Sequence, residues 1–175
     1  QRRVLVMGAL ANSAASITAS LSLDSVLQDI LNQIHQALMV EIVSLALVDH
    51  EENTLVFRAT TEKNTQIIGK KIDFGEGIIG WVAQEQQGII VPDATADIRF
   101  AHLTEEYDDF TLRAVVCAPI LSDGELIGVL QAANPIEGAF DPDALTMING
   151  IGSLAGTAIR HAQLFEDLQA AHRRY

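Results

Sequence analysis

Two arginines, Arg99 and Arg113, are the side chains that this chain offers for holding a charged ligand. A guanidinium group can clamp a carboxylate or a phosphate through two parallel hydrogen bonds. Arg99 can equally tie down its own loop by pairing with Asp93 or Asp97, and we favour that structural pairing. The two arginines therefore indicate either a site for a small organic anion or a set of local ion pairs.

The other reactive groups are one cysteine and five histidines. Cys117 lies inside the apolar run 113–121, whereas a reactive thiol needs a positive and partly exposed site, so we expect a buried and inert cysteine. His102 with Glu105 and Glu106 is the best candidate for binding a metal, but such a charged run is more typical of a solvated loop. Because no nucleophile–base pair or metal triad is evident, we predict no catalytic residue and no bound metal.

Composition limits the classes of protein to which the chain can belong. Its 175 residues, 49% of them hydrophobic, are enough for one domain with a real core. The formal net charge of −12 opposes contact with a phosphate backbone, so we expect no nucleic-acid partner. No apolar run reaches the roughly 18 residues that a membrane helix needs, so we expect no direct membrane insertion. The single cysteine and the absence of an initiator Met favour a cytoplasmic excerpt of a longer protein.

The pattern of apolar residues predicts the elements that would position these side chains. The expected strands are 42–48 and 54–60 as one hairpin, 70–74 and 88–91 as short strands, and 113–121 and 126–133 as a second hairpin. Helices are expected after Ser22, over 78–83, and from Asp141 and Pro142 onward. The connection 93–111 is long, and connections of that length in compact domains are often functional.

The most specific pattern lies between residues 74 and 134. It reads Phe74-Gly75-Glu76-Gly77-Ile78-Ile79-Gly80-Trp81, then Val91-Pro92-Asp93, then Asp97-Ile98-Arg99-Phe100, and then the second hairpin with Ser122-Asp123-Gly124-Glu125 at its turn. The glycines allow sharp turns and close approach, but they lack the ending of a phosphate-binding loop. This order resembles a GAF domain, a small-molecule-sensing and dimerising module of signalling proteins, over roughly residues 23–165.

The resemblance implies an α+β fold with a central antiparallel sheet of about six strands. The N- and C-terminal helices would lie on one face of the sheet, and the long connection and the short helix would cover a pocket on the other. Residues 22–160 would form the GAF-like domain. Residues 1–21 would be an N-terminal linker or dimerisation helix, and residues 161–175 a C-terminal signalling-helix extension.

Some activities of GAF relatives do not fit these residues. Relatives that reduce methionine sulfoxide use several cysteines, and bilin-binding relatives use a cysteine in a region where this chain has none. Relatives that bind cyclic nucleotides carry Asn-Lys, then Phe, then Asp-Glu. Here Asn134 and Phe140 are present, but Pro135 replaces the lysine and Ala144 follows Asp143. This incomplete motif argues against cyclic nucleotide binding, and we expect Asn134 and Phe140 to serve a turn and the packing of the last helix.

Both ends of the chain carry apolar residues at alternating steps of three and four. Such heptad stripes, where one copy of the domain leaves them uncovered, usually mark an interface. We therefore expect a homodimer whose interface includes Met7, Leu10, Ile17, Ile151, Ala158 and Phe165. Gly150, Gly152 and Gly156 each cost about 1 kcal/mol in a helix, and we expect close approach of a helix or the sheet to compensate.

Alternation along the strand near Cys117 predicts which residues face a pocket. Val115 and Cys117 would share the pocket face with Arg113, while the small side chains of Ala114, Val116 and Ala118 would face the helices. The predicted pocket is bordered by Phe74, Ile79, Val91, Asp93, Arg99, Phe100, Arg113 and Val115. We expect an unidentified small organic ligand there and no cofactor.

The GAF resemblance, taken with these patterns, implies a non-catalytic regulatory sensor domain that binds a small molecule, dimerises, or does both. It would control an attached output domain in signal transduction, as in a two-component system, and a ligand would act by preferring one helix arrangement. The alternative is a ligand-free dimerisation spacer, and a small enzyme is the third hypothesis. The residues name neither the ligand nor the output domain.

Overall fold

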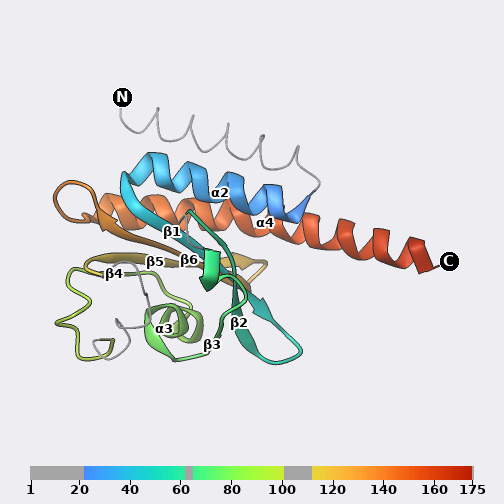
Figure 1. Cartoon of the computed structure of the whole chain (residues 1–175), viewed down its shortest axis with the longest axis horizontal. Coiled ribbons are helices and arrows are strands. Elements are labelled where there is room, and N and C mark those ends of the chain that lie inside the picture. Colours follow the sequence, from blue (N-terminus) through green and yellow to red (C-terminus); the bar gives the residue numbers. More distant parts are fainter. Residues whose placement is uncertain (1–21, 62–64, 101–111, 175) are drawn as a thin grey trace.

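A six-stranded antiparallel sheet separates two layers in the computed structural model of the protein, which describes residues 22–61, 65–100 and 112–174 (Figure 1). The strand order is β3-β2-β1-β6-β5-β4. The strands are β1 (Val40–Asp49), β2 (Thr54–Thr60), β3 (Lys71–Asp73), β4 (Ile89–Val91), β5 (Val115–Ser122) and β6 (Glu125–Pro135). The helices are α2 (Leu23–Leu38), α3 (Gly77–Glu85) and α4 (Pro142–Arg174), with a 3-10 turn, η1, at Thr65–Ile67. The predicted α+β fold is confirmed.

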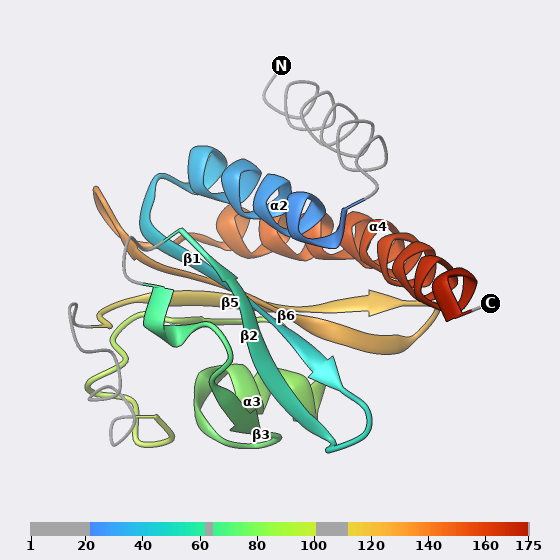
Figure 2. The ribbon, with the colours of Figure 1, turned by 45° about the vertical axis from the view of Figure 1, so that its right-hand side comes forward.

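Helices α2 and α4 lie side by side on one face of the sheet (Figure 2). The apolar stripe of α2, spaced at three and four residues, is buried against the sheet and α4. Ser22 occupies the predicted N-cap position, but its side chain makes no capping bond. Instead, Glu166 of α4 accepts the Leu23 N–H at 3.3 Å and so caps α2 from the neighbouring helix.

Helix α4 begins as predicted, because Oδ1 of Asp141 accepts the Ala144 N–H at 3.0 Å. A Cβ on Gly156 would lie 2.3 Å from the Leu121 carbonyl oxygen, and one on Gly152 would lie 3.0 Å from that of Pro119. The expected close approach of α4 to the sheet is therefore confirmed at these two glycines. The helix then runs through residue 160 to Arg174 without interruption.

Two residues of the predicted dimer interface are used inside the chain. Ile151 and Ala158 are each only 5% exposed and belong to the core between the helices and the sheet. The expectation that they form an uncovered stripe is not met, because this side of α4 packs on β5. Phe165 remains half-buried, and Met7, Leu10 and Ile17 lie outside the described residues.

The faces of β5 are those that alternation predicts. Val116 and Ala118 pack in the helix-side core, whereas Val115 and Cys117 pack in a second core beneath α3. Gly75 has a φ of +86°, and a Cβ on Gly80 would lie 2.5 Å from the Asp73 carbonyl oxygen. These two glycines let the chain turn tightly into α3 and seat that short helix on the sheet.

Candidate functional site

The sheet face beneath α3 brings together the apolar residues of the predicted pocket. Ile79, Val91, Phe100 and Val115 are buried in one cluster, and Phe74 packs against its edge. Helix α3, strand β4 and the segment 93–100 surround this cluster; we call residues 93–100 the cover. All of these elements are short, which distinguishes this face from the one beneath α2 and α4 (Figure 1).

Asp93, another predicted pocket residue, is exposed and forms the turn with which the cover begins. Its Oδ1 accepts the backbone N–H of Thr95 at 3.0 Å and the Thr95 hydroxyl at 2.6 Å. The hydroxyl bond is the main reason that the pKa of Asp93 is lowered. The turn places Ala94 in the fully buried cluster, so Asp93 positions the cover without entering the apolar interior.

Arg99 is paired with Asp97 in the same loop. Nε donates to Oδ1 at 3.2 Å, and Nη2 donates to Oδ2 at 3.1 Å. This bidentate contact lowers the pKa of Asp97. The guanidinium carbon lies 5.2 Å from the centre of the Trp81 ring and 4.9 Å from that of Phe100. The favoured structural pairing is thus confirmed for Asp97, and Arg99 closes the rim of the apolar cluster.

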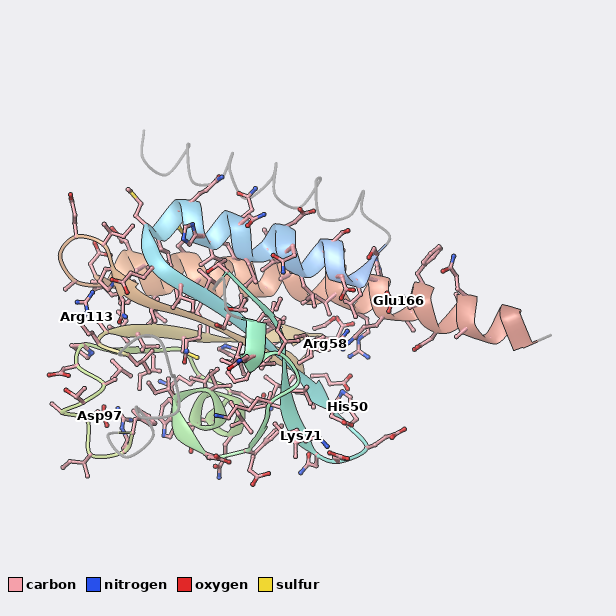
Figure 3. All side chains as sticks on the ribbon, viewed as in Figure 1. His50, Arg58, Lys71, Asp97, Arg113 and Glu166 are labelled. Atoms are coloured by element: carbon pink, nitrogen blue, oxygen red, sulfur yellow. The ribbon has the colours of Figure 1, made fainter. Side chains whose placement is uncertain are left out.

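Arg113 points to a different carboxylate. Its Nη2 lies 3.5 Å from Oε1 of Glu41, and its backbone N–H donates to Oδ1 of Asn134 at 2.7 Å. Figure 3 shows Arg113 and Asp97 at the same end of the molecule. Since each predicted guanidinium already has a carboxylate partner, the surplus positive charge that would select an anionic ligand is not present at these two residues.

A row of polar side chains on the same face was missed by the sequence analysis. Strand pairing places Thr60 opposite Ser44, Ser44 opposite Gln131, and Gln131 opposite Cys117. Residues directly opposite one another in a sheet project to the same side. We call Thr60, Ser44 and Gln131 the polar row; with Cys117 they cross four neighbouring strands on the α3 side of the sheet.

The polar row is buried inside an otherwise apolar layer. Ser44 is 2% exposed, Gln131 is 3% exposed and Thr60 is 6% exposed. The hydroxyl oxygens of Ser44 and Thr60 are 3.4 Å apart, and both Thr60 and Gln131 have further interaction partners in the chain. Hydroxyl and amide groups at this depth can donate to and accept from a polar ligand. Cys117 beside them is fully buried, which raises the pKa of its thiol, so the prediction of a buried cysteine is confirmed.

The sequence contained a weak signal for the polar row. Ser44 interrupts the run Ile42–Val48, and Gln131 interrupts the run Leu126–Ala133. Neither interruption shows by itself that the two side chains meet, because the strand register decides that. Only the pairing of β1 with β6 and β2 aligns them.

The candidate metal cluster at His102, Glu105 and Glu106 lies outside the described residues. Within the ranges 22–61, 65–100 and 112–174, no group of three or more His, Cys, Asp or Glu side chains could hold a metal ion. In the same ranges, no helix combines the length and apolar character needed to cross a membrane.

Comparison with known proteins identifies relatives of this fold. The family model described as GAF domain matches residues 22–159. A probable 3',5'-cyclic phosphodiesterase of Caenorhabditis elegans is 27% identical over 167 residues, which covers 88% of this chain and 22% of that protein. A cGMP-specific 3',5'-cyclic phosphodiesterase of Drosophila mojavensis is 34% identical over 131 residues, which covers 73% of this chain and 12% of that protein. The chain thus spans less than a quarter of the length of either relative.

Solved structures share the fold at lower identity. The GAF domain of a phosphoenolpyruvate-protein phosphotransferase from Coxiella burnetii superposes with a TM-score of 0.81 at 24% identity, covering 91% of this chain and 95% of that chain. A free methionine-R-sulfoxide reductase from Neisseria meningitidis, in complex with its substrate, gives 0.76 at 18% identity, covering 94% of this chain and 93% of that one. At these identities the similarity shows a common fold and nothing about activity.

Proposed function

The chain belongs to the GAF domain family, and from this premise we propose that it is a sensor domain that binds a small organic molecule on the α3 face and thereby controls an attached output domain. The domain is regulatory rather than catalytic. Its match leaves most of each related phosphodiesterase uncovered, so the chemistry of those enzymes is assigned to their other parts.

The polar row carries this proposal. Burying a hydroxyl or an amide in an apolar layer lowers stability unless hydrogen bonds compensate, so a core that serves only packing avoids such groups. Among the described residues, three buried polar side chains lie together on the α3 face. The one other buried polar side chain among the described residues is that of Asn134, at the end of β6. A ligand seated on the α3 face would exchange hydrogen bonds with the polar row and contact the apolar wall.

The other pocket residues then have distinct proposed roles. Phe74, Ile79, Val91, Phe100 and Val115 supply apolar contact area to the ligand. Asp93 and Arg99 hold the cover through their bonds to Thr95 and Asp97, and Arg113 anchors the base of the cover. A ligand with hydrogen-bonding groups and no required net charge suits this arrangement.

The experiment that tests binding is native mass spectrometry of the intact chain purified under mild conditions. We expect an adduct of a few hundred daltons, the size of a small organic molecule. Thermal unfolding with cGMP and with cAMP is the first defined probe, because the curated relatives are cyclic-nucleotide phosphodiesterases. Pro135 and Ala144 argue against these nucleotides, so we expect neither to raise the unfolding temperature. A purified chain with no adduct would contradict the sensor proposal.

The dimer belongs to the same proposal, but Ile151 and Ala158 are buried within the chain, so we propose an interface on other residues of α4. Leu154, Leu164 and Leu168 of α4 are 39%, 52% and 69% exposed, and Phe165 lies beside them. Figure 2 shows the end of α4 projecting beyond the sheet. Pairing with a second copy would cover these side chains and place two signalling helices together. Light scattering should show a dimer that the double change Leu164→Glu, Leu168→Glu dissociates and the control Gln169→Glu leaves intact. A wild-type monomer at tens of micromolar would contradict this.

A ligand-free dimerisation spacer is the second candidate. Both arginines near the cover are paired with carboxylates. Within the described ranges, Oγ1 of Thr54 is the one buried side-chain N or O atom without a hydrogen-bond partner. The α3 face is therefore satisfied without a ligand, and a spacer would show dimer formation with no adduct in the same mass spectra.

A further inference from the structure

Asn134 holds three segments together at one end of the sheet. It is 1% exposed and has a φ of +61°, a backbone conformation that asparagine tolerates better than most residues. Its Oδ1 accepts the Arg113 N–H at 2.7 Å, its Nδ2 donates to Oε2 of Glu41 at 3.1 Å, and its own N–H donates to the Ala114 carbonyl at 2.8 Å. A single buried residue thus links the end of β6, the start of β5 and the start of β1.

One of these links leads to the cover. Arg113 donates its backbone N–H to Asn134, and its carbonyl oxygen accepts the Ala94 N–H at 2.6 Å. Ala94 is the fully buried residue of the cover and lies in the α3-side cluster. The position of the cover therefore depends on the same peptide segment that Asn134 fixes.

The segment that follows Asn134 leads to the two long helices. The Ile136 N–H, two residues after Asn134, donates at 3.0 Å to the carbonyl of Met39, which ends α2 with a φ of +51°. The same connection continues through Phe140, which packs on the helix-side core, into α4. Figure 1 shows that the α2–β1 and β6–α4 connections lie at the same end of the sheet as the cover.

The charged pair beside Asn134 adds little by itself. Glu41 and Arg113 are 50% and 56% exposed, and pairs as exposed as this are worth at most about 1 kcal/mol. The buried amide is the stronger element, because it satisfies groups that would otherwise lose a hydrogen bond out of reach of water. We therefore expect removal of the Asn134 side chain to destabilise all three segments that it links.

We propose that Asn134 couples the cover of the α3 face to the α2–β1 and β6–α4 connections, so that the cover and the helix ends change together. This goes beyond ligand binding, since the bonds exist in the chain without a ligand. Contiguity alone does not show coupling; a change at one end must be detected at the other.

Hydrogen exchange of the intact chain without ligand provides that test. Asn134→Gly keeps a residue that tolerates positive φ but deletes the amide. We expect the Ala94 and Ile136 amides to exchange about tenfold faster, which is about 1.4 kcal/mol. Asn53→Gly is the matched control, since Asn53 has a φ of +55° in the β1–β2 turn, and it should leave both amides unchanged. Acceleration at Ile136 without Ala94, or equal acceleration of the Leu45 and Leu130 amides in the sheet centre, would overturn the proposal.

A second variant tests whether a change in β1 alters the cover, which it does not contact through a hydrogen bond. Glu41→Gln alters β1 at a residue with no hydrogen bond to the cover, and we expect the Ala94 amide to exchange about twofold to threefold faster, in the range of weak surface pairs. Glu137→Gln, an exposed carboxyl on the β6–α4 connection, should leave Ala94 unchanged. Additive effects of Asn134→Gly and Glu41→Gln on Ala94 would contradict a shared element, because residues acting through one network are non-additive.

Discussion

The two faces of the sheet are built from the same strands but on different principles. On one face, α2 and α4 present long apolar stripes to an apolar floor, and two glycines bring α4 against β5. On the other face, short elements cover a floor that contains the polar row, and an ion pair over Trp81 closes the rim. Alternate residues of a strand thus contribute to the core beneath the long helices on one side and, on the other, to a layer that includes buried polar groups.

The largest expected effect comes from transferring the chemistry of one face to the other. Leu130 is fully buried on the helix side, directly before Gln131 of the polar row. Leu130→Gln would place an amide among apolar side chains, losing Leu packing and leaving polar groups unsatisfied. We expect unfolding in urea to show a loss of about 4 kcal/mol. A loss below about 1 kcal/mol would show that the helix-side core accepts polar groups and would remove the contrast between the faces.

Close packing of α4 gives the second effect. Gly156→Val would force a side chain into the Leu121 carbonyl, where a Cβ already lies at 2.3 Å. We expect a loss of about 3 kcal/mol, although valine is a better helix residue than glycine. Thr157→Val, at the adjacent exposed position, is the control and should change stability by less than about 0.5 kcal/mol. Equal behaviour of the two variants would mean that α4 does not sit tightly on β5.

The mirror change on the α3 face should cost less. Gln131→Leu keeps the side-chain volume similar and suits the surrounding apolar residues, but it leaves the amide's partners with one bond fewer. We expect a loss of about 1 kcal/mol in urea unfolding, well below that of Leu130→Gln. If Gln131→Leu proved the more destabilising of the two, the polar row would be a structural network rather than a recognition surface.

The rim of the α3 face should open when Asp97 is protonated. Asp97 has a lowered pKa because it accepts hydrogen bonds from Arg99, so its contribution is present above the ordinary aspartate pKa and is lost as the pH falls through the lowered value. Protonation would release Arg99 from its place over Trp81, the single tryptophan. Trp81 fluorescence should therefore shift only as the pH falls below the usual aspartate pKa, and helical circular dichroism followed in parallel separates this shift from global unfolding. Asp97→Asn should show the acid-type emission already at neutral pH, and an unchanged spectrum would contradict this account of the rim.

How much the sequence could predict differs between the two faces. The helix face follows from periodicity: the α2 stripe, the Asp141–Pro142 start and the glycines of α4 all indicated the observed packing. The stripe of α4 was harder to interpret, because periodicity identifies Ile151 and Ala158 as one face but does not say whether the sheet or a second chain covers it.

The α3 face depended on contacts between segments far apart in sequence. The sequence could predict its apolar residues. It could also predict the pairing of Arg99 with Asp97, because the two residues are only two positions apart. The sequence could not predict the Arg113–Glu41 pair or the polar row, because both depend on the register of β1 against β6. Glu41 lies within β1, one residue before the predicted start of that strand, because pairing with β6 extends to Val40 opposite Pro135.

The most direct test of the account compares adjacent residues on opposite faces by native mass spectrometry of the intact chain. Wild type, Gln131→Leu and Leu130→Met would be purified in parallel, the last being a conservative change on the helix side. We expect the same small-molecule adduct on wild type and Leu130→Met, and its loss from Gln131→Leu while that variant remains folded. An adduct retained at full occupancy by Gln131→Leu, or absent from wild type, would contradict the claim that the α3 face is the sensing face.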